Sequence, residues 1–79
     1  MLRMKWIADT IGPRRLHCEI EQRTLTPITA ALDGLVGYYL YIWENGKGLA
    51  DEVQDDFETA VEGAYKRYGV PKEAWRQVE

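Results

Sequence analysis

The sequence predicts an α+β domain, in which an antiparallel sheet of three to four strands carries one long C-terminal helix on one face. Two observations predict this fold class. Residues 14–22 alternate between apolar and polar side chains, as a half-buried strand does. Residues 57–68 repeat apolar side chains with the 3.6-residue period of an amphipathic helix. The 79 residues, 46% of them apolar, suit a single globular domain spanning 1–79.

Two strands are expected in the first third of the chain, separated by a turn at Gly12-Pro13. The first covers residues 2–8 and alternates, with Leu2, Met4 and Trp6 facing one way and Arg3 and Lys5 the other. The second covers residues 14–22. Its apolar face holds Leu16, Cys18 and Ile20, and its polar face holds Arg15, His17, Glu19 and Glu21.

Residues 24–37 allow two interpretations. Thr26 and Pro27 can begin a second short helix near 27–35, because Thr suits the N-cap and Pro the first helical position. The pair Asp33-Gly34 between apolar residues instead favours a hairpin. Both interpretations remain open from the sequence.

Residues 38–43 form an aromatic strand, followed by a turn at Asn45-Gly46 and a short return strand over 49–53. Successive side chains of a strand point to opposite faces. The more aliphatic set, Tyr38, Leu40 and Ile42, is expected under the helix. Tyr39, Tyr41 and Trp43 are then expected on the other face, and a register change of one residue would exchange the two sets.

The C-terminal helix begins after Asp55, which is expected as its N-cap because Glu58 follows at the spacing of a capping box. Its apolar face combines Phe57, Ala60, Val61, Ala64, Tyr65 and Tyr68. Gly69 and Pro71 end the helix, and Val70 is expected to fold back onto Tyr65. The tail is expected to make one turn that brings Trp75 onto the edge of the sheet or helix.

The composition argues against several kinds of catalytic and cofactor site. The chain contains no serine, one histidine and one cysteine, so neither a serine nucleophile nor a structural zinc site can form within it. His17 and Cys18 are neighbours on a strand and face opposite ways, which leaves Cys18 as a small buried hydrophobe. The sequence also lacks a phosphate-binding P-loop. We therefore expect a non-catalytic protein without a metal or cofactor.

The same residues suggest where the protein works. A single cysteine gives no disulfide framework, and the first residues lack the apolar core of a signal peptide. No apolar run approaches the length of a membrane span. With a net charge of −3, the chain is also not expected to bind nucleic acid directly. We expect a cytoplasmic protein that does not associate with membranes.

The aromatic face of the sheet is the main candidate for a binding site, because one helix cannot cover both faces. Large aromatic side chains are enriched at the centres of protein interfaces. The simplest partner is a second copy of the chain, and we expect a homodimer. The residues expected at the interface are Tyr39, Tyr41, Trp43, His17, Glu19 and Glu21. A solvated face or a small-ligand groove would be the alternative.

A second candidate is the acidic segment that precedes and begins the helix. Asp51, Glu52, Asp55 and Asp56 fall close together, and no basic residue occurs from 48 to 65. Such a patch could dock a basic protein, as an acidic inhibitor or immunity-type protein does. Favourable charge at a helix N-terminus accounts for the same residues without a partner.

Overall fold

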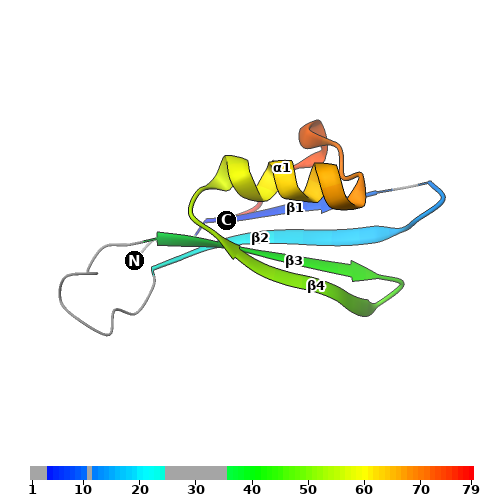
Figure 1. Cartoon of the computed structure of the whole chain (residues 1–79), viewed down its shortest axis with the longest axis horizontal. Coiled ribbons are helices and arrows are strands. Elements are labelled where there is room, and N and C mark those ends of the chain that lie inside the picture. The colour runs from blue at the N-terminus through cyan, green and yellow to red at the C-terminus, as the bar shows by residue number, and fades with distance from the viewer. Residues whose placement is uncertain (1–3, 11, 25–35) are drawn as a thin grey trace.

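The protein is described by a computed structural model covering residues 4–10, 12–24 and 36–79. Five strands form one antiparallel sheet in the order β4-β3-β2-β1-β5 (Figure 1). They are β1 (Lys5–Asp9), β2 (Leu16–Thr24), β3 (Val36–Glu44), β4 (Lys47–Gln54) and β5 (Arg76–Gln77). The helix α1 (Phe57–Tyr68) and the short 3₁₀ helix η2 (Lys72–Ala74) are the other elements of the described residues. The predicted α+β fold is confirmed, with five strands instead of three or four.

The fifth strand was missed because it is only two residues long, too short to show a period. After η2 the chain turns back along β1, where Gln77 pairs with Trp6 and Arg76 with Ile7. The expected turn before Trp75 is present as η2, and the Trp75 ring packs against the core. The tail therefore adds an edge to the sheet beside β1.

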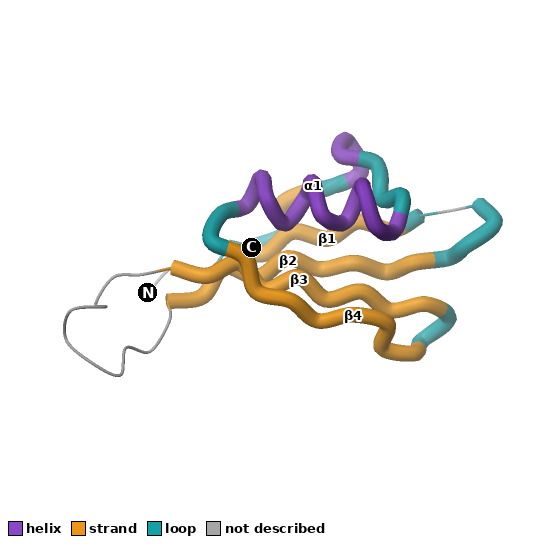
Figure 2. The backbone as a smooth tube through the Cα atoms, in the orientation of Figure 1, coloured by secondary structure: helices purple, strands orange, loops and turns teal. Residues whose placement is uncertain are grey.

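The core lies between the sheet and α1, which runs across one face of it (Figures 1 and 2). The inward side chains alternate along the central strands β2 and β3, as the sequence predicted. Ala60 and Ala64 are fully buried, and their small size lets the helix approach the sheet closely. The buried hydrophobic residues of the described part of the chain are Ala8, Leu16, Cys18, Ile20, Leu40, Ile42, Ala60, Val61, Ala64 and Val70.

An aromatic cluster closes one end of this core. The Phe57 ring lies 4.4 Å from that of Trp6 and 6.3 Å from that of Tyr38, measured between centroids. The Tyr38 hydroxyl also accepts a 2.9 Å hydrogen bond from Gln22. Tyr65 was expected on the same face of the helix but is 51% exposed, because the helix turns it away from the sheet. Val70 instead folds under the helix, and its amide donates to the Ala64 carbonyl.

The turn between β3 and β4 is the Asn-Gly turn that the sequence predicted. Asn45 and Gly46 have φ values of 52° and 82°, in the left-handed region where these two residues are favoured. The pairing of Glu44 with Lys47 across this turn fixes the register of the hairpin. The alternatives for 27–35, a short helix or a hairpin at Asp33-Gly34, lie outside the described residues.

The N-cap of α1 is Asp56, so the prediction of Asp55 is wrong by one residue. The Asp56 carboxylate accepts a 2.7 Å hydrogen bond from the Thr59 amide, and this bond lowers the pKa of Asp56. Both aspartates have a suitable side chain, and Glu58 favoured Asp55. In the structure Asp55 lies between the end of β4 at Gln54 and the cap, and the helix starts one residue later than the capping-box spacing suggests.

Exchanging each aspartate separately tests this assignment. We expect Asp56→Ala to lower the melting temperature by several degrees, because it removes the acceptor of an otherwise unpaired helix amide. Asp55→Ala is the matched control and should change it little. The Asp56 pKa is lowered on folding, so its contribution is present above the ordinary value of 3.8 and disappears as the pH falls through the folded pKa. Equal losses for both variants would contradict the assignment.

The helix glycine gives a second test of packing. The Arg67 side chain passes over Gly63 to pair with Glu52 on β4, so a Cβ at Gly63 would lie 2.7 Å from the guanidinium. Alanine gains roughly 0.5–1 kcal/mol over glycine within a helix. We expect Gly63→Ala to give that full gain only in an Arg67→Ala background, where no guanidinium has to move away from the new methyl group. A double-mutant cycle of urea midpoints measures the difference, and equal gains in both backgrounds would show that Arg67 moves aside at no cost.

Candidate interaction site

The face of the sheet opposite α1, called the outer face below, carries a ladder of aromatic rings along β3. Tyr39, Tyr41 and Trp43 alternate with buried residues and therefore point the same way. The ring centroids of Tyr39 and Tyr41 lie 6.4 Å apart, and those of Tyr41 and Trp43 5.9 Å apart, in stacked arrangements. Each ring retains part of its surface in solvent. The expected orientation of this strand is therefore present.

Strand β2 sets a row of charged side chains beside the ladder. His17 pairs with Trp43, Glu19 with Tyr41 and Glu21 with Tyr39. The imidazole of His17 lies 5.5 Å from the Trp43 ring, so polar and aromatic groups pack side by side on this face. All six residues that the sequence predicted for the interface thus lie together.

Basic side chains bind the two glutamates of this row. The Arg23 guanidinium binds Glu21 at 2.6 Å and lies 5.0 Å from the centroid of the Tyr39 ring. Lys5 on β1 binds Glu19 at 3.2 Å, and this hydrogen bond raises the pKa of Lys5. The carboxylates of β2 therefore lie among compensating charges.

His17 is held between two carboxylates. Its Nδ1 lies 2.7 Å from Asp9 Oδ1 and its Nε2 lies 2.9 Å from Glu19 Oε2. A neutral imidazole has only one N–H and can donate to one of them, whereas the imidazolium donates to both. The hydrogen bond to Asp9 and then that to Glu19 raise the pKa of His17 above 6.5. Burial of Glu19 raises its own pKa, but the bonds from His17 and Lys5 outweigh burial and lower it.

Further residues of the outer face come from the edges of the sheet, and the sequence analysis did not include them. Across β1 and β5, Ile7 pairs with Glu19 and Arg76 pairs with Ile7. On β4, Asp51 pairs with Tyr41 and Val53 with Tyr39. Val53 is 53% exposed, beside the aromatic ladder. Alternation along 49–53 could have identified the β4 residues, but no signal marked Arg76, because β5 is so short.

Open hollows adjoin the ladder on both sides. One hollow, of about 370 Å³, lies beside Tyr41 and Leu49, next to the register shift of β4 near Trp43. A second, of about 600 Å³, lies between His17, Arg15 and the Asn45-Gly46 turn. Both hollows are open to solvent. A small-ligand site usually encloses most of its ligand, so these open hollows fit the uneven surface of a protein interface better.

The four acidic residues of the alternative site do not form one surface. Asp51 and Glu52 are successive strand residues and point to opposite faces of the sheet. Glu52 pairs with Arg67 and Asp56 caps the helix, so two of the four carboxylates already have partners within the chain. Docking of a basic protein there stays a prediction.

The environment of Cys18 and the grouping of possible metal ligands bear on the chemistry of the described residues. Cys18 is fully buried, and this burial raises the pKa of its thiol to about 11. Within 4–10, 12–24 and 36–79, no three His, Cys, Asp or Glu side chains are grouped as metal ligands. Nor does the one long helix of these ranges have the length and apolarity needed to cross a membrane.

Comparison with protein-family models, with curated proteins and with solved structures found no match to this chain. The interpretation of the outer face consequently rests on its own geometry.

The single histidine gives a direct test of this geometry. We expect its pKa, measured by proton NMR, to lie above 6.5 in the folded protein, and Asp9→Asn or Glu19→Gln to lower it. Because folding raises this pKa, His17 stabilises the fold fully below pH 6.5, and its contribution disappears as the pH rises through the folded value. Asp55→Asn is the matched control and should leave the pKa unchanged. A wild-type pKa at or below 6.5 would contradict the double hydrogen bond.

Proposed function

We propose that the protein is a non-catalytic interaction module that associates with a second copy of itself through the outer face. The observation that carries the proposal is the stacked ladder of Tyr39, Tyr41 and Trp43 on the face that α1 leaves open. Each such ring can bury on the order of 150–250 Å² in an interface. Three adjacent rings supply the apolar centre that a protein interface requires.

The surroundings of the ladder support a protein partner. The carboxylates beside the rings are already paired within the chain, Glu21 with Arg23 and Glu19 with Lys5, so a partner would not cover bare charges there. These ion pairs are partly exposed and add little to the stability of the fold. They hold the aromatic rings and their neighbours in one arrangement before a partner arrives, which reduces the entropy lost on binding.

The size of the face indicates a weak association. Five strands about 4.8 Å apart span roughly 19 Å, and five residues rise about 17 Å, which gives a planar area of about 330 Å² per copy. Side chains add surface area to this planar value, but such an interface still belongs to the small class that buries less than about 1,200 Å² in total. We therefore expect association at micromolar to high-micromolar concentrations.

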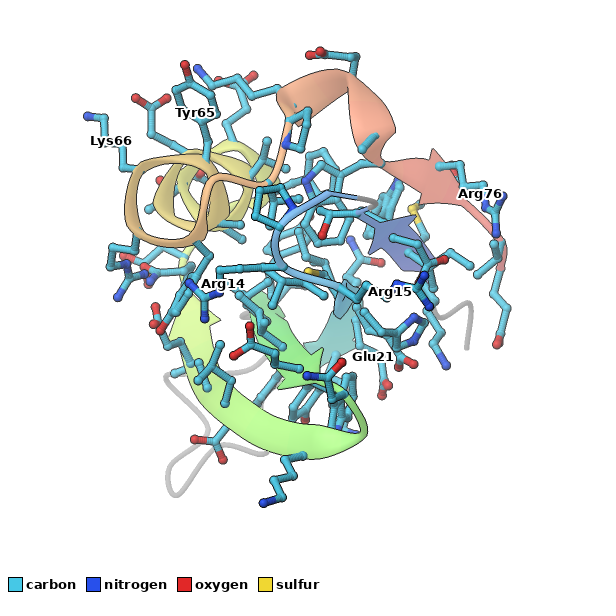
Figure 3. All side chains as sticks on the ribbon, turned by 90° about the vertical axis from the view of Figure 1, so that its right-hand side faces the viewer. Arg14, Arg15, Glu21, Tyr65, Lys66 and Arg76 are labelled. Atoms are coloured by element: carbon cyan, nitrogen blue, oxygen red, sulfur yellow. The ribbon has the colours of Figure 1, made fainter. Side chains whose placement is uncertain are left out.

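Sedimentation equilibrium of the wild type and of Tyr41→Glu/Trp43→Glu tests the proposal. We expect a dimer at high micromolar concentration for the wild type and a folded monomer for the variant, with the helical circular dichroism retained. Two buried carboxylates without partners cannot be accommodated at an apolar centre. Tyr65→Glu is the matched control, since Tyr65 is an exposed tyrosine on the opposite side of the sheet (Figure 3). A monomeric wild type at these concentrations would refute self-association.

A further inference from the structure

We infer that the two copies pack sheet against sheet about a two-fold axis parallel to the strands, so that Asp51 of one copy meets Arg76 of the other. This inference rests on the proposed self-association and adds its geometry. It follows from how charged and apolar residues are distributed across the outer face. The two edges of the sheet carry groups that can pair with each other, at the same positions along the strands.

Residues that pair side by side form a row across the sheet, with one residue from each strand. The first row includes Tyr41. The strand pairing orders it as Arg76, Ile7, Glu19, Tyr41 and Asp51, from β5 to β4. A basic residue therefore lies at one edge and an acidic residue at the other, roughly 19 Å away across five strands. Both side chains are exposed, and neither has an ion-pair partner among the described residues.

The neighbouring row, through Tyr39, has an apolar residue at each edge. Val78 lies beyond β5 and donates its amide to the Lys5 carbonyl at 2.8 Å, which sets it beside Lys5 in the row. The row is therefore Val78, Lys5, Glu21, Tyr39 and Val53. Val53 is 53% and Val78 45% exposed, so both ends present apolar surface to solvent.

A two-fold axis along β2 brings opposite ends of each row together. Arg76 then faces the second copy's Asp51, Val78 faces its Val53, and Lys5 faces its Tyr39, where a cation can lie over the ring. A two-fold axis perpendicular to the strands would instead place each edge against the same edge of the second copy. Arg76 of one copy would then lie near Arg76 of the other. Packed sheets lie about 10 Å apart, a gap that an arginine and an aspartate can span together.

The axis along β2 brings Glu19 and Glu21 near the same two residues of the second copy. Such proximity would be unfavourable for carboxylates without bound cations. In this protein each carboxylate already binds cations of its own chain. Glu19 is hydrogen-bonded by Lys5 and His17, and Glu21 by Arg23. The groups that meet at the axis are thus neutralised clusters, and the decisive unpaired charges lie at the edges.

Mixing two charge-reversal variants tests the geometry. Asp51→Arg alone sets Arg against Arg76, and Arg76→Asp alone sets Asp against Asp51, twice in each dimer. We expect each variant alone to dimerise about tenfold more weakly than the wild type. An equimolar mixture of the two restores both ion pairs and should form heterodimers with an affinity near that of the wild type. Sedimentation equilibrium measures all three.

Glu73→Arg and Lys66→Asp are the matched controls, because they change the net charge equally from the helix side, and their mixture should associate as the wild type does. If Tyr41→Glu/Trp43→Glu abolishes the wild-type dimer but the mixture gains nothing over either variant alone, the axis is wrong and the proposed self-association stands. If the wild type remains a monomer, the proposed function fails, and the inference fails with it. Circular dichroism confirms that each variant is folded.

Discussion

Among the residues that the structure describes, one helix of twelve residues lies on a sheet of five strands, and it can cover only one of its two faces. This constraint determines the rest of the molecule. The strict alternation of Leu16, Cys18 and Ile20 with His17, Glu19 and Glu21 separates a side that packs under α1 from a side that does not. Because β2 is the central strand, its alternation sets the orientation of its neighbours through the pairing. Every residue of the outer face follows from that register.

The outer face shows how a small protein can carry large aromatic rings outside its core. Tyr39, Tyr41 and Trp43 stack on one another and against the side chains of β2, which covers part of each ring without a second layer. The carboxylates beside them bind Lys5, His17 and Arg23. Exposed ion pairs contribute little to stability. Two of these side chains also contact the rings, since Arg23 lies over Tyr39 and His17 lies beside Trp43.

Long periodic elements could be predicted from the sequence, and features that depend on one or two residues could not. Alternation identified β2 and β3 and the orientation of Tyr39, Tyr41 and Trp43. The helix period identified α1, but not its first residue. Adjacent aspartates offer two caps of the same chemistry, and the hydrogen bond from the Thr59 amide to Asp56 is visible only in the fold.

The β5 edge of the outer face was beyond the reach of sequence patterns. Arg76 and Val78 belong to it only because a two-residue strand pairs with β1, and that pairing is a tertiary contact with no local period. The aromatic centre of the candidate site was therefore predictable. The complementary groups at its edges required the fold.

The edges of the sheet also explain why association is expected through a face. An unpaired strand edge is itself a place where another chain could add. Strand β4 is interrupted by a bulge opposite Trp43, and it carries acidic residues at Asp51 and Glu52, two features that oppose regular pairing with a second strand. The opposite edge offers only the two residues of β5. Backbone addition is thus disfavoured at both edges, whereas the outer face between them presents its aromatic rings directly to solvent.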